Sequence, residues 1–203
     1  MLPVQSKYRI AKRLGAGIFE QTQTQKFALS EARSAKTKKR GGRGGSEYGR
    51  QLLEKQRVRF TYGITEKQLS GYAKVAYEEE NPSLSLHRAL ESRADSIAYR
   101  AGFATTRRAA RQMVSHGHIT VNGKRTTVPS HRLTKGDVIA VREGSRSSAL
   151  FAHLGNSEVV KRTPPNWLEV DTDAMKITVL GETSYSAGEA GLDYSAVFEF
   201  YSR

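Results

Sequence analysis

The residues with the clearest chemical pattern are the cations between Thr105 and Arg125. This segment holds five Lys or Arg, two His and no Asp or Glu. A run of charge taken alone is most often a solvated face of a helix. Here the absence of acids, together with the cations of a predicted hairpin, favours a surface for phosphate groups. Such a surface gains affinity for a polyanion by releasing its counterions, so the pattern predicts nucleic-acid binding.

Local signals assign the first of these cations to a short helix. Thr105 is a good N-cap, and Gly117 is a natural end because a left-handed turn disfavours any residue with a Cβ. The face toward a core is formed by apolar residues at helical spacing, namely Ala109, Ala110, Met113 and Val114. The opposite face carries Arg107, Arg108 and Arg111.

A hairpin carries the remaining cations. Asn122-Gly123 is the strongest hairpin signal in the chain, because a type I′ turn needs positive φ at both central residues. The strands expected around it are residues 118–121 and 124–128, with a third at 138–142 that can close a small sheet. Lys124 and Arg125 therefore lie at or just beyond the turn.

Three motifs carry a resemblance to a known domain. They are GFATTRRAARQMVSHGHITVNGKR at residues 102–125, Pro129-Ser130, and KGDVIAV at residues 135–141. Together they resemble the RNA-binding domain of small-subunit ribosomal protein S-four. That domain also occurs in pseudouridine synthases, some aminoacyl-tRNA synthetases and small RNA-binding heat-shock proteins. The motifs alone therefore imply RNA binding and leave the activity open.

The flanking segments resemble the ribosomal protein itself. They are SEYGRQLLEKQRVRFTYGI at residues 46–64, WLEVD at residues 167–171 and FEFYSR at residues 198–203. The resemblance implies a structural constituent of the small ribosomal subunit that performs no catalysis. Such a protein binds small-subunit ribosomal RNA directly at a multi-helix junction, supports early subunit assembly and borders the path by which messenger RNA enters.

The same resemblance implies partners and contact residues. The partners are small-subunit ribosomal RNA, neighbouring small-subunit ribosomal proteins and, nearby, messenger RNA; neither a cofactor nor a homo-oligomer is expected. The RNA-contacting residues it assigns are Ser46, Tyr48, Arg50, Lys55, Arg57 and Arg59 on the first helix, and Arg107, Arg108, Arg111, His116, Lys124 and Arg125 on the later helix and hairpin.

The composition of the chain limits the classes of protein it could be. With 203 residues, of which 37% are hydrophobic, two small domains are favoured over one deep core. A formal net charge of +13 and a pI near 10.1 point to a polyanionic partner. A membrane partner is not expected, because the chain has no run of about 18 apolar residues. The absence of Cys and of an apolar leader favours a cytosolic protein without disulfides, and the resemblance implies that it is located on the ribosome.

Residues 1–45 are expected to form a basic, flexible N-terminal arm. They hold eleven Lys or Arg, two Glu and only scattered apolar residues, too few to offset the entropy of ordering. Glycines around Arg40 and Arg43 would let these two side chains reach separate phosphates when the arm folds along RNA. Some members of the ribosomal family hold zinc with four cysteines near this end, and this chain lacks them.

The remaining residues predict an α+β fold, and the resemblance implies that a helical domain is interrupted by an inserted RNA-binding domain. The helical domain comprises residues 46–92 and is completed by residues 182–203, where Asp193 caps a terminal helix. By resemblance to the family, that terminal helix returns to the first domain. The inserted domain, residues 93–181, has helices packed on a short, mainly antiparallel sheet, with further strands at 167–170 and 176–180.

Cap signals define the helices of the helical domain. Ser46 is predicted to cap a helix over residues 47–62, and Thr65 with Gln68 forms the capping-box pattern of a second helix. A third helix is expected to start at Pro82 and Ser83, with residues facing inward until Gly102.

Two acids on that third helix could suggest different chemistry. Glu91 and Asp95 lie i, i+4, the spacing of paired carboxylates on one helical face. Arg88 and Arg93 are close in sequence, so surface ion pairs are the better interpretation. A zinc triad of His116, His118 and His131 is disfavoured because no carboxylate or Cys is near in sequence, and no metal site is expected.

Two rival functions follow from the same RNA-binding module. One is a free RNA-binding regulator, such as a translational repressor or a ribosome-rescue factor. The other is an RNA-modifying enzyme, which would need a catalytic domain of about 150 residues beyond the module. The sequence contains no HExxH, GxSxG, Walker or dinucleotide-binding motif, so an enzyme is not expected.

Overall fold

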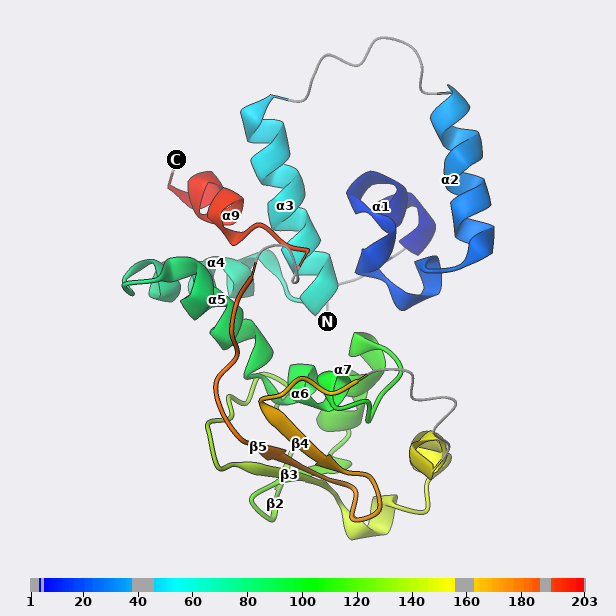
Figure 1. The fold of residues 1–203 in the computed structure, drawn as a ribbon, viewed down its shortest axis with the longest axis vertical. Coiled ribbons are helices and arrows are strands. Elements are labelled where there is room, and N and C mark those ends of the chain that lie inside the picture. The colour runs from blue at the N-terminus through cyan, green and yellow to red at the C-terminus, as the bar shows by residue number, and fades with distance from the viewer. Residues whose placement is uncertain (1–3, 5, 38–45, 156–162, 187–190, 203) are drawn as a thin grey trace. The chain divides into compact units, whose positions relative to one another are not determined.

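The computed structural model describes residues 4, 6–37, 46–155, 163–186 and 191–202 (Figure 1). The chain divides into two units: a first unit of Met1–Leu86 with Ser186–Arg203, and a second unit of His87–Tyr185. The boundary falls inside helix α5 (Pro82–Glu91). Helices combined with one sheet make this an α+β protein, which confirms the predicted class.

The N-terminal part of the first unit is folded where the sequence predicted a flexible arm. It consists of helix α1 (Lys7–Leu14), the 3-10 turns η1 (Ala16–Ile18) and η2 (Glu20–Thr22), and helix α2 (Gln25–Thr37). Ala11, Phe19 and Phe27 are buried and pack with Phe60 of helix α3 (Glu47–Tyr62). The prediction counted only the apolar residues within the arm, but Phe60, which packs against them, lies outside it.

The caps predicted for the next two helices are confirmed. The Ser46 hydroxyl accepts a hydrogen bond from the backbone N–H of Gly49 at 3.2 Å, and Gly63 ends α3 with a φ of 63°. Thr65 and Gln68 form the reciprocal capping box of helix α4 (Glu66–Tyr77). Since each cap satisfies backbone N–H groups that have no partner within the helix, these short-range signals define where α3 and α4 begin.

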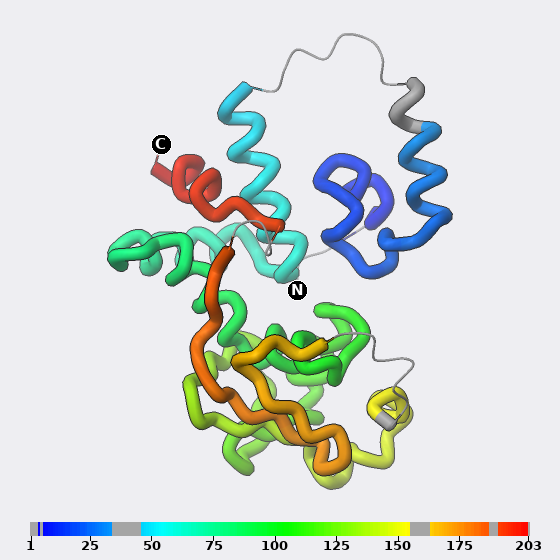
Figure 2. The backbone as a smooth tube through the Cα atoms, in the orientation of Figure 1, coloured from blue at the N-terminus to red at the C-terminus, as the bar shows by residue number. Residues whose placement is uncertain are grey.

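Helix α9 (Tyr194–Tyr201) packs on α3 and α4, although more than a hundred residues separate it from them in sequence (Figures 1 and 2). Asp193 caps it by accepting a hydrogen bond from the backbone N–H of Ala196 at 3.2 Å. The Tyr194 side chain is fully buried, and its hydroxyl lies 3.2 Å from that of Tyr62. The first unit is therefore assembled from both ends of the chain.

Among the described residues of the second unit, five strands form one antiparallel sheet with the order β2-β1-β3-β5-β4. Its strands are β1 (Ile119–Val121), β2 (Lys124–Thr126), β3 (Val138–Val141), β4 (Leu168–Asp171) and β5 (Lys176–Val179). The helices on the sheet are α6 (Ala94–Arg100) and α7 (Arg107–Ser115). Alternate strand residues such as Ile119, Ile139 and Ile177 share one core with both helices.

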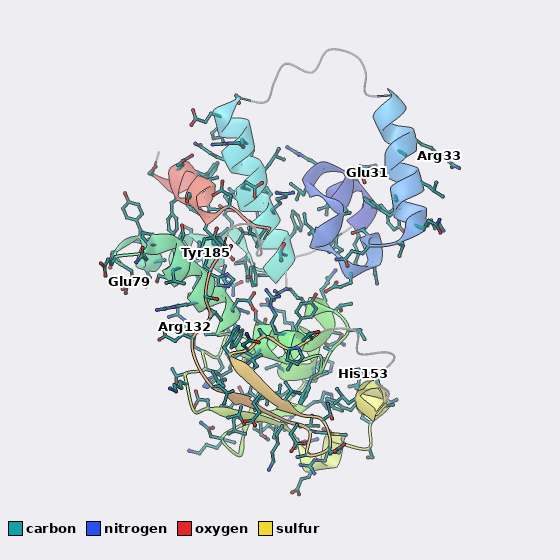
Figure 3. All side chains as sticks on the ribbon, viewed as in Figure 1. Glu31, Arg33, Glu79, Arg132, His153 and Tyr185 are labelled. Carbon is teal, nitrogen blue, oxygen red and sulfur yellow. The ribbon has the colours of Figure 1, made fainter. Side chains whose placement is uncertain are left out.

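Two 3-10 turns complete the second unit, η3 (Glu143–Ser145) and η4 (Ala149–Gly155). Phe151 of η4 is buried in the core. His153 of the same turn, labelled in Figure 3, lies 3.2 Å from the carbonyl oxygen of Gly102. The turns therefore cover part of the core beside the helices.

The third predicted helix is interrupted, and this corrects the sequence prediction. It ends at Glu91 and a new helix begins at Ala94, because Arg93 has an extended backbone and bridges to Arg132. The backbone N–H of Ala94 donates to the carbonyl of His131 at 2.8 Å instead of to the preceding turn. Helical periodicity did not reveal the break, since the inward residues keep their spacing across it.

Candidate nucleic-acid interface

Helix α7 begins one residue later than predicted. Thr106, and not Thr105, is the N-cap, and its hydroxyl accepts a hydrogen bond from the backbone N–H of Ala109 at 3.1 Å. The fully buried residues of the helix are Ala110, Met113 and Val114. The backbone turns at Gly117 with a φ of 72°, as the sequence predicted.

The hairpin that follows α7 is confirmed and is braced by a neighbouring turn. Asn122 and Gly123 have φ values of 48° and 78°, as a type I′ turn requires. The Asn122 amide donates to the Asp137 carboxylate at 2.8 Å and accepts from the backbone N–H of Val138 at 2.9 Å. These bonds attach the hairpin turn to the start of β3, so Lys124 follows a fixed turn.

Arg107 is directed into the protein, although the sequence assigned it to RNA. Its guanidinium donates to Glu91 at 3.1 Å and to the Ser96 hydroxyl at 3.3 Å. It also lies 4.6 Å from the ring centroid of Tyr99. With its charge balanced and its planar face covered, Arg107 stabilises the junction of α5, α6 and α7.

The acids that balance these arginines were misjudged from the sequence. Glu91 and Asp95 lie on different helices and are buried, whereas exposed ion pairs along one helix were predicted. The Glu91 side chain is 1% exposed and accepts two hydrogen bonds from Arg100, at 2.8 and 2.7 Å, besides that from Arg107. Arg88, its predicted partner, pairs with Glu182 at 2.8 Å.

Arg111 is drawn toward the second buried acid. Its guanidinium lies 3.8 Å from Asp95, which also accepts two hydrogen bonds from Arg93 at 2.9 and 2.7 Å. The Arg111 side chain is 16% exposed. Arg107 and Arg111 therefore share the face of α7 that meets α5 and α6, and we no longer propose them as the principal phosphate contacts.

The basic residues that remain at the surface gather around the end of α7 and the hairpin. His116, Lys124 and Arg125 are exposed, and Arg108 is half-exposed. Arg142 joins them from the end of β3, where its backbone N–H donates to the carbonyl of His118 at 2.9 Å. We call these five residues the hairpin cluster. The sequence analysis missed Arg142, although the predicted pairing of its strand beneath the hairpin could have indicated it.

His118 lies among these cations without adding to their charge. Partial burial lowers the pKa of His118 below its usual value, and the charges of His116, Arg142 and Arg125 lower it further. Its ring nitrogen Nδ1 lies 3.0 Å from the Ser145 hydroxyl. The lowered pKa favours the neutral form of His118, whose ring links the start of β1 to η3 through Ser145.

The candidate residues of α3 separate into internal and exposed groups. Lys55 is 6% exposed and pairs with Glu66 at 2.9 Å. Arg57 donates through Nε to the carbonyl of Leu14 at 2.6 Å, which attaches α3 to the end of α1. Arg59 lies 3.0 Å from the second oxygen of Glu66. These three cations stabilise the first unit.

The other candidates of α3 lie at its N-terminal end. Ser46 is used as the helix cap, while Tyr48 and Arg50 are exposed and remain candidates for an RNA contact. The Tyr48 ring lies 5.6 Å from that of Phe200 on α9. Arg40 and Arg43 lie outside the described residues.

Glu66 organises the contact between α3 and α9. Besides Lys55 and Arg59, it accepts a hydrogen bond from the Tyr201 hydroxyl at 2.8 Å. Burial acts to raise the pKa of Glu66, but the hydrogen bonds and positive charges outweigh it and hold that pKa below its ordinary value of 4.5. Lys55 also lies 4.0 Å from the ring centroid of Phe200.

We expect the packing of α9 to weaken in acid because of Glu66. A carboxylate whose pKa is lowered by folding stabilises the protein above its unfolded pKa, near 4.5, and loses this effect as the pH falls through the lower folded value. Hydrogen exchange of α9 amides below that pH measures the loss. The variant Glu66→Gln should be less protected at pH 7 and lack this part of the acid dependence, unlike the exposed control Glu79→Gln (Figure 3). An unchanged acid dependence in Glu66→Gln would contradict the assignment.

Neither a metal site nor a membrane-spanning helix is found in the part of the chain that the structure describes. There, no group of three His, Cys, Asp or Glu side chains is arranged to hold a metal ion. Within the same residues, every helix is too short or too polar to cross a bilayer.

Comparison with known proteins gives matches along the chain. Residues 4–91 match the family model described as Ribosomal protein S4/S9 N-terminal domain, and residues 92–139 match the S4 domain. The small ribosomal subunit protein uS4 of Chloroflexus aurantiacus is 39% identical over 204 residues, covering 96% of each chain. That of Borrelia duttonii is 36% identical over 206 residues, covering 98% of this chain and 96% of its own. The protein uS4 of Mycobacterium avium is 43% identical over 159 residues, which cover 78% of this chain and 79% of its own.

Proposed function

The chain belongs to the family of small ribosomal subunit protein uS4, and on this basis we propose that it is a structural, non-enzymatic constituent of the small ribosomal subunit. In this role it binds small-subunit ribosomal RNA directly at a multi-helix junction and supports early subunit assembly. It borders the path by which messenger RNA enters and contacts neighbouring small-subunit proteins. Its location is then the ribosome in the cytoplasm.

The hairpin cluster supports the RNA-binding part of this proposal. Its cations come from α7, the α7–β1 connection, β2 and the residue after β3, elements that the core and the Asn122–Asp137 bond hold together. Because the buried acids Glu91 and Asp95 are already engaged by arginines, they do not offset the charge of the cluster. A fixed group of cations matches the fixed phosphate spacing of folded RNA.

The mode of recognition follows from the shape of RNA. An A-form helix hides its base edges in a deep, narrow groove that side chains cannot read. Cations such as Lys124 and Arg108 therefore recognise the shape of the RNA and the spacing of its phosphates. Base-specific contacts are expected to be few.

Arg108→Ala and Lys124→Ala are each expected to weaken binding to small-subunit ribosomal RNA and to reduce its salt dependence. Each change removes about one phosphate contact, so the slope of log affinity against log salt should fall by roughly one. Filter binding at several salt concentrations measures both quantities. The matched control is Lys176→Ala, an exposed cation opposite Asp171 on the neighbouring strand. Unchanged affinity and slope in the Arg108→Ala/Lys124→Ala double variant, with the fold intact, would exclude this surface.

Sedimentation separates the proposed function from its nearest rival. A ribosomal constituent should be present in cell lysate at one copy per small subunit and remain there in high salt. A free RNA-binding regulator, such as a translational repressor or ribosome-rescue factor, should sediment substoichiometrically and dissociate. Quantitative immunoblotting across the gradient decides between the two.

A further inference from the structure

Arg125 contacts the end of α7 through its own hydrogen bonds. Its Nε donates to the carbonyl of Gly117 and its Nη2 donates to the carbonyl of His116, both at 3.2 Å. Carbonyl groups at the end of a helix lack partners within it and carry partial negative charge. A guanidinium there therefore gains both hydrogen bonds and a favourable electrostatic interaction. Since Arg125 lies on β2, opposite Thr120 of β1, these bonds attach the returning strand of the hairpin to the helix.

Gly117 makes room for this arrangement. A Cβ on Gly117 would lie 2.8 Å from the guanidinium carbon of Arg125, so the flexible end of the arginine would have to move away to admit it. Gly123 and Gly136 also have positive φ values, 78° and 92°, yet an added Cβ at either would meet nothing within 4 Å. Gly117 is thus needed both for its backbone conformation and for the side chain that covers it.

The edge of the guanidinium that faces the helix is one of the two edges that can bind phosphate through paired N–H groups. Arginine recognises phosphate most specifically through two parallel N–H groups. In Arg125 the Nε and Nη2 edge is directed at two carbonyls of its own chain. Its neighbour Lys124 is exposed beside the turn and has no such intramolecular bond among those described.

We infer that Arg125 is a positioning residue: it fixes the hairpin on the end of α7 so that Lys124 and Arg108 meet the RNA at a set spacing. This inference rests on the proposed function, because it assigns a role within the same RNA-binding surface. It replaces the assignment of Arg125 as a phosphate contact that the sequence suggested.

A positioning role and a contact role predict different salt dependences. Arg125→Ala should lower affinity for the chain's own small-subunit ribosomal RNA about tenfold, the equivalent of one net hydrogen bond, and leave the salt slope unchanged. Arg125→Lys should behave like Arg125→Ala, because a single ammonium does not reproduce the planar fork that spans two carbonyls. Lys124→Ala should cost less affinity in the Arg125→Ala background than alone, since the lysine is then no longer held in place.

Titration of the full-length RNA with the wild-type chain and these variants, at several salt concentrations, tests the inference. It is overturned if Arg125→Ala lowers the slope by roughly one while Arg125→Lys restores affinity, or if the effects of Lys124→Ala and Arg125→Ala simply add. Failure of the wild-type chain to bind this RNA would instead overturn the proposed function, and this role of Arg125 with it.

A comparison of alanine substitutions at two glycines tests the contact of Arg125 with the end of α7 in the absence of RNA. Gly117→Ala should destabilise the protein more than Gly136→Ala, because both strain a positive φ but only the former displaces Arg125 from its hydrogen bonds to the end of α7. In the Arg125→Ala background the two alanine variants should cost the same. An equal cost already in the wild-type background would show that Arg125 does not occupy this position in solution and would overturn the inference.

Discussion

Asp95→Ala is expected to lower the free energy of unfolding of the second unit by about 3 to 5 kcal/mol. Asp95 is buried, and the Arg93 side chain that donates to it twice has no exposed surface. Removing the carboxylate leaves a guanidinium in the interior without that counter-charge. Urea unfolding followed by the fluorescence of Trp167, which packs against the core of this unit, measures the loss.

Two comparisons make the Asp95 prediction specific. Glu182→Ala removes an ion pair with Arg88 whose side chains are 67% and 45% exposed, so it should cost less than about 1 kcal/mol. The double variant Arg93→Met/Asp95→Leu removes both buried charges and should recover much of the stability lost in Asp95→Ala. A small loss in Asp95→Ala, no larger than that of the surface pair, would contradict the expectation.

Phe198→Ala is expected to destabilise the first unit by about 3 to 5 kcal/mol. Phe198 is buried in α9, and its ring lies 6.0 Å from that of Tyr77 on α4. Truncation leaves a cavity in a unit that has few large aliphatic residues to close it. Hydrogen exchange of α3 and α4 amides measures the loss, and deletion of residues 194–203 should produce the same loosening in full.

Controls for the Phe198 prediction lie within the same chain. Leu29→Ala removes a large apolar side chain that is 57% exposed in the first unit, and it should have little effect. Amides of β1 and β3 in the second unit should keep their protection when α9 is deleted. Loosening confined to the second unit would mean that α9 stabilises a different part of the protein.

Signals that act over a few residues were readable from the sequence. The caps at Ser46 and Thr65 and the turn at Asn122-Gly123 depend on bonds to atoms at most a few positions away. Their side-chain chemistry determines the local backbone almost independently of the rest of the chain. Helix and strand positions near them were therefore predicted to within a residue or two.

The roles of individual cations were not readable in this way. Arg107 and Lys55 were assigned to RNA by resemblance, but carboxylates on other helices engage both: the buried Glu91 engages Arg107, and the partly exposed Glu66 engages Lys55. The partner of Arg107 is 16 positions away and that of Lys55 is 11 positions away. Helical periodicity tells which residues share a face and does not tell what that face meets.

The break in the predicted third helix at Arg93 was missed for the same reason, because it depends on a residue distant in sequence. The backbone of Arg93 pairs with Arg132 and its side chain with Asp95, and only the first of these partners is distant in sequence. Periodicity of the inward residues was preserved across the break, so the pattern continued to indicate one helix. A pairing between segments about forty residues apart decided the local structure.

The placement of α9 with α3 in one unit has a consequence for how the chain is made. Roughly 130 residues, from Tyr62 to Tyr194, must be synthesised after α3 before α9 exists to cover it. At about 5 to 20 residues per second this is a delay on the order of ten seconds. The second unit, being continuous in sequence, is complete before then. During translation the apolar face of α3 therefore stays uncovered by α9, and in this interval the nascent protein exposes apolar surface that a chaperone could protect.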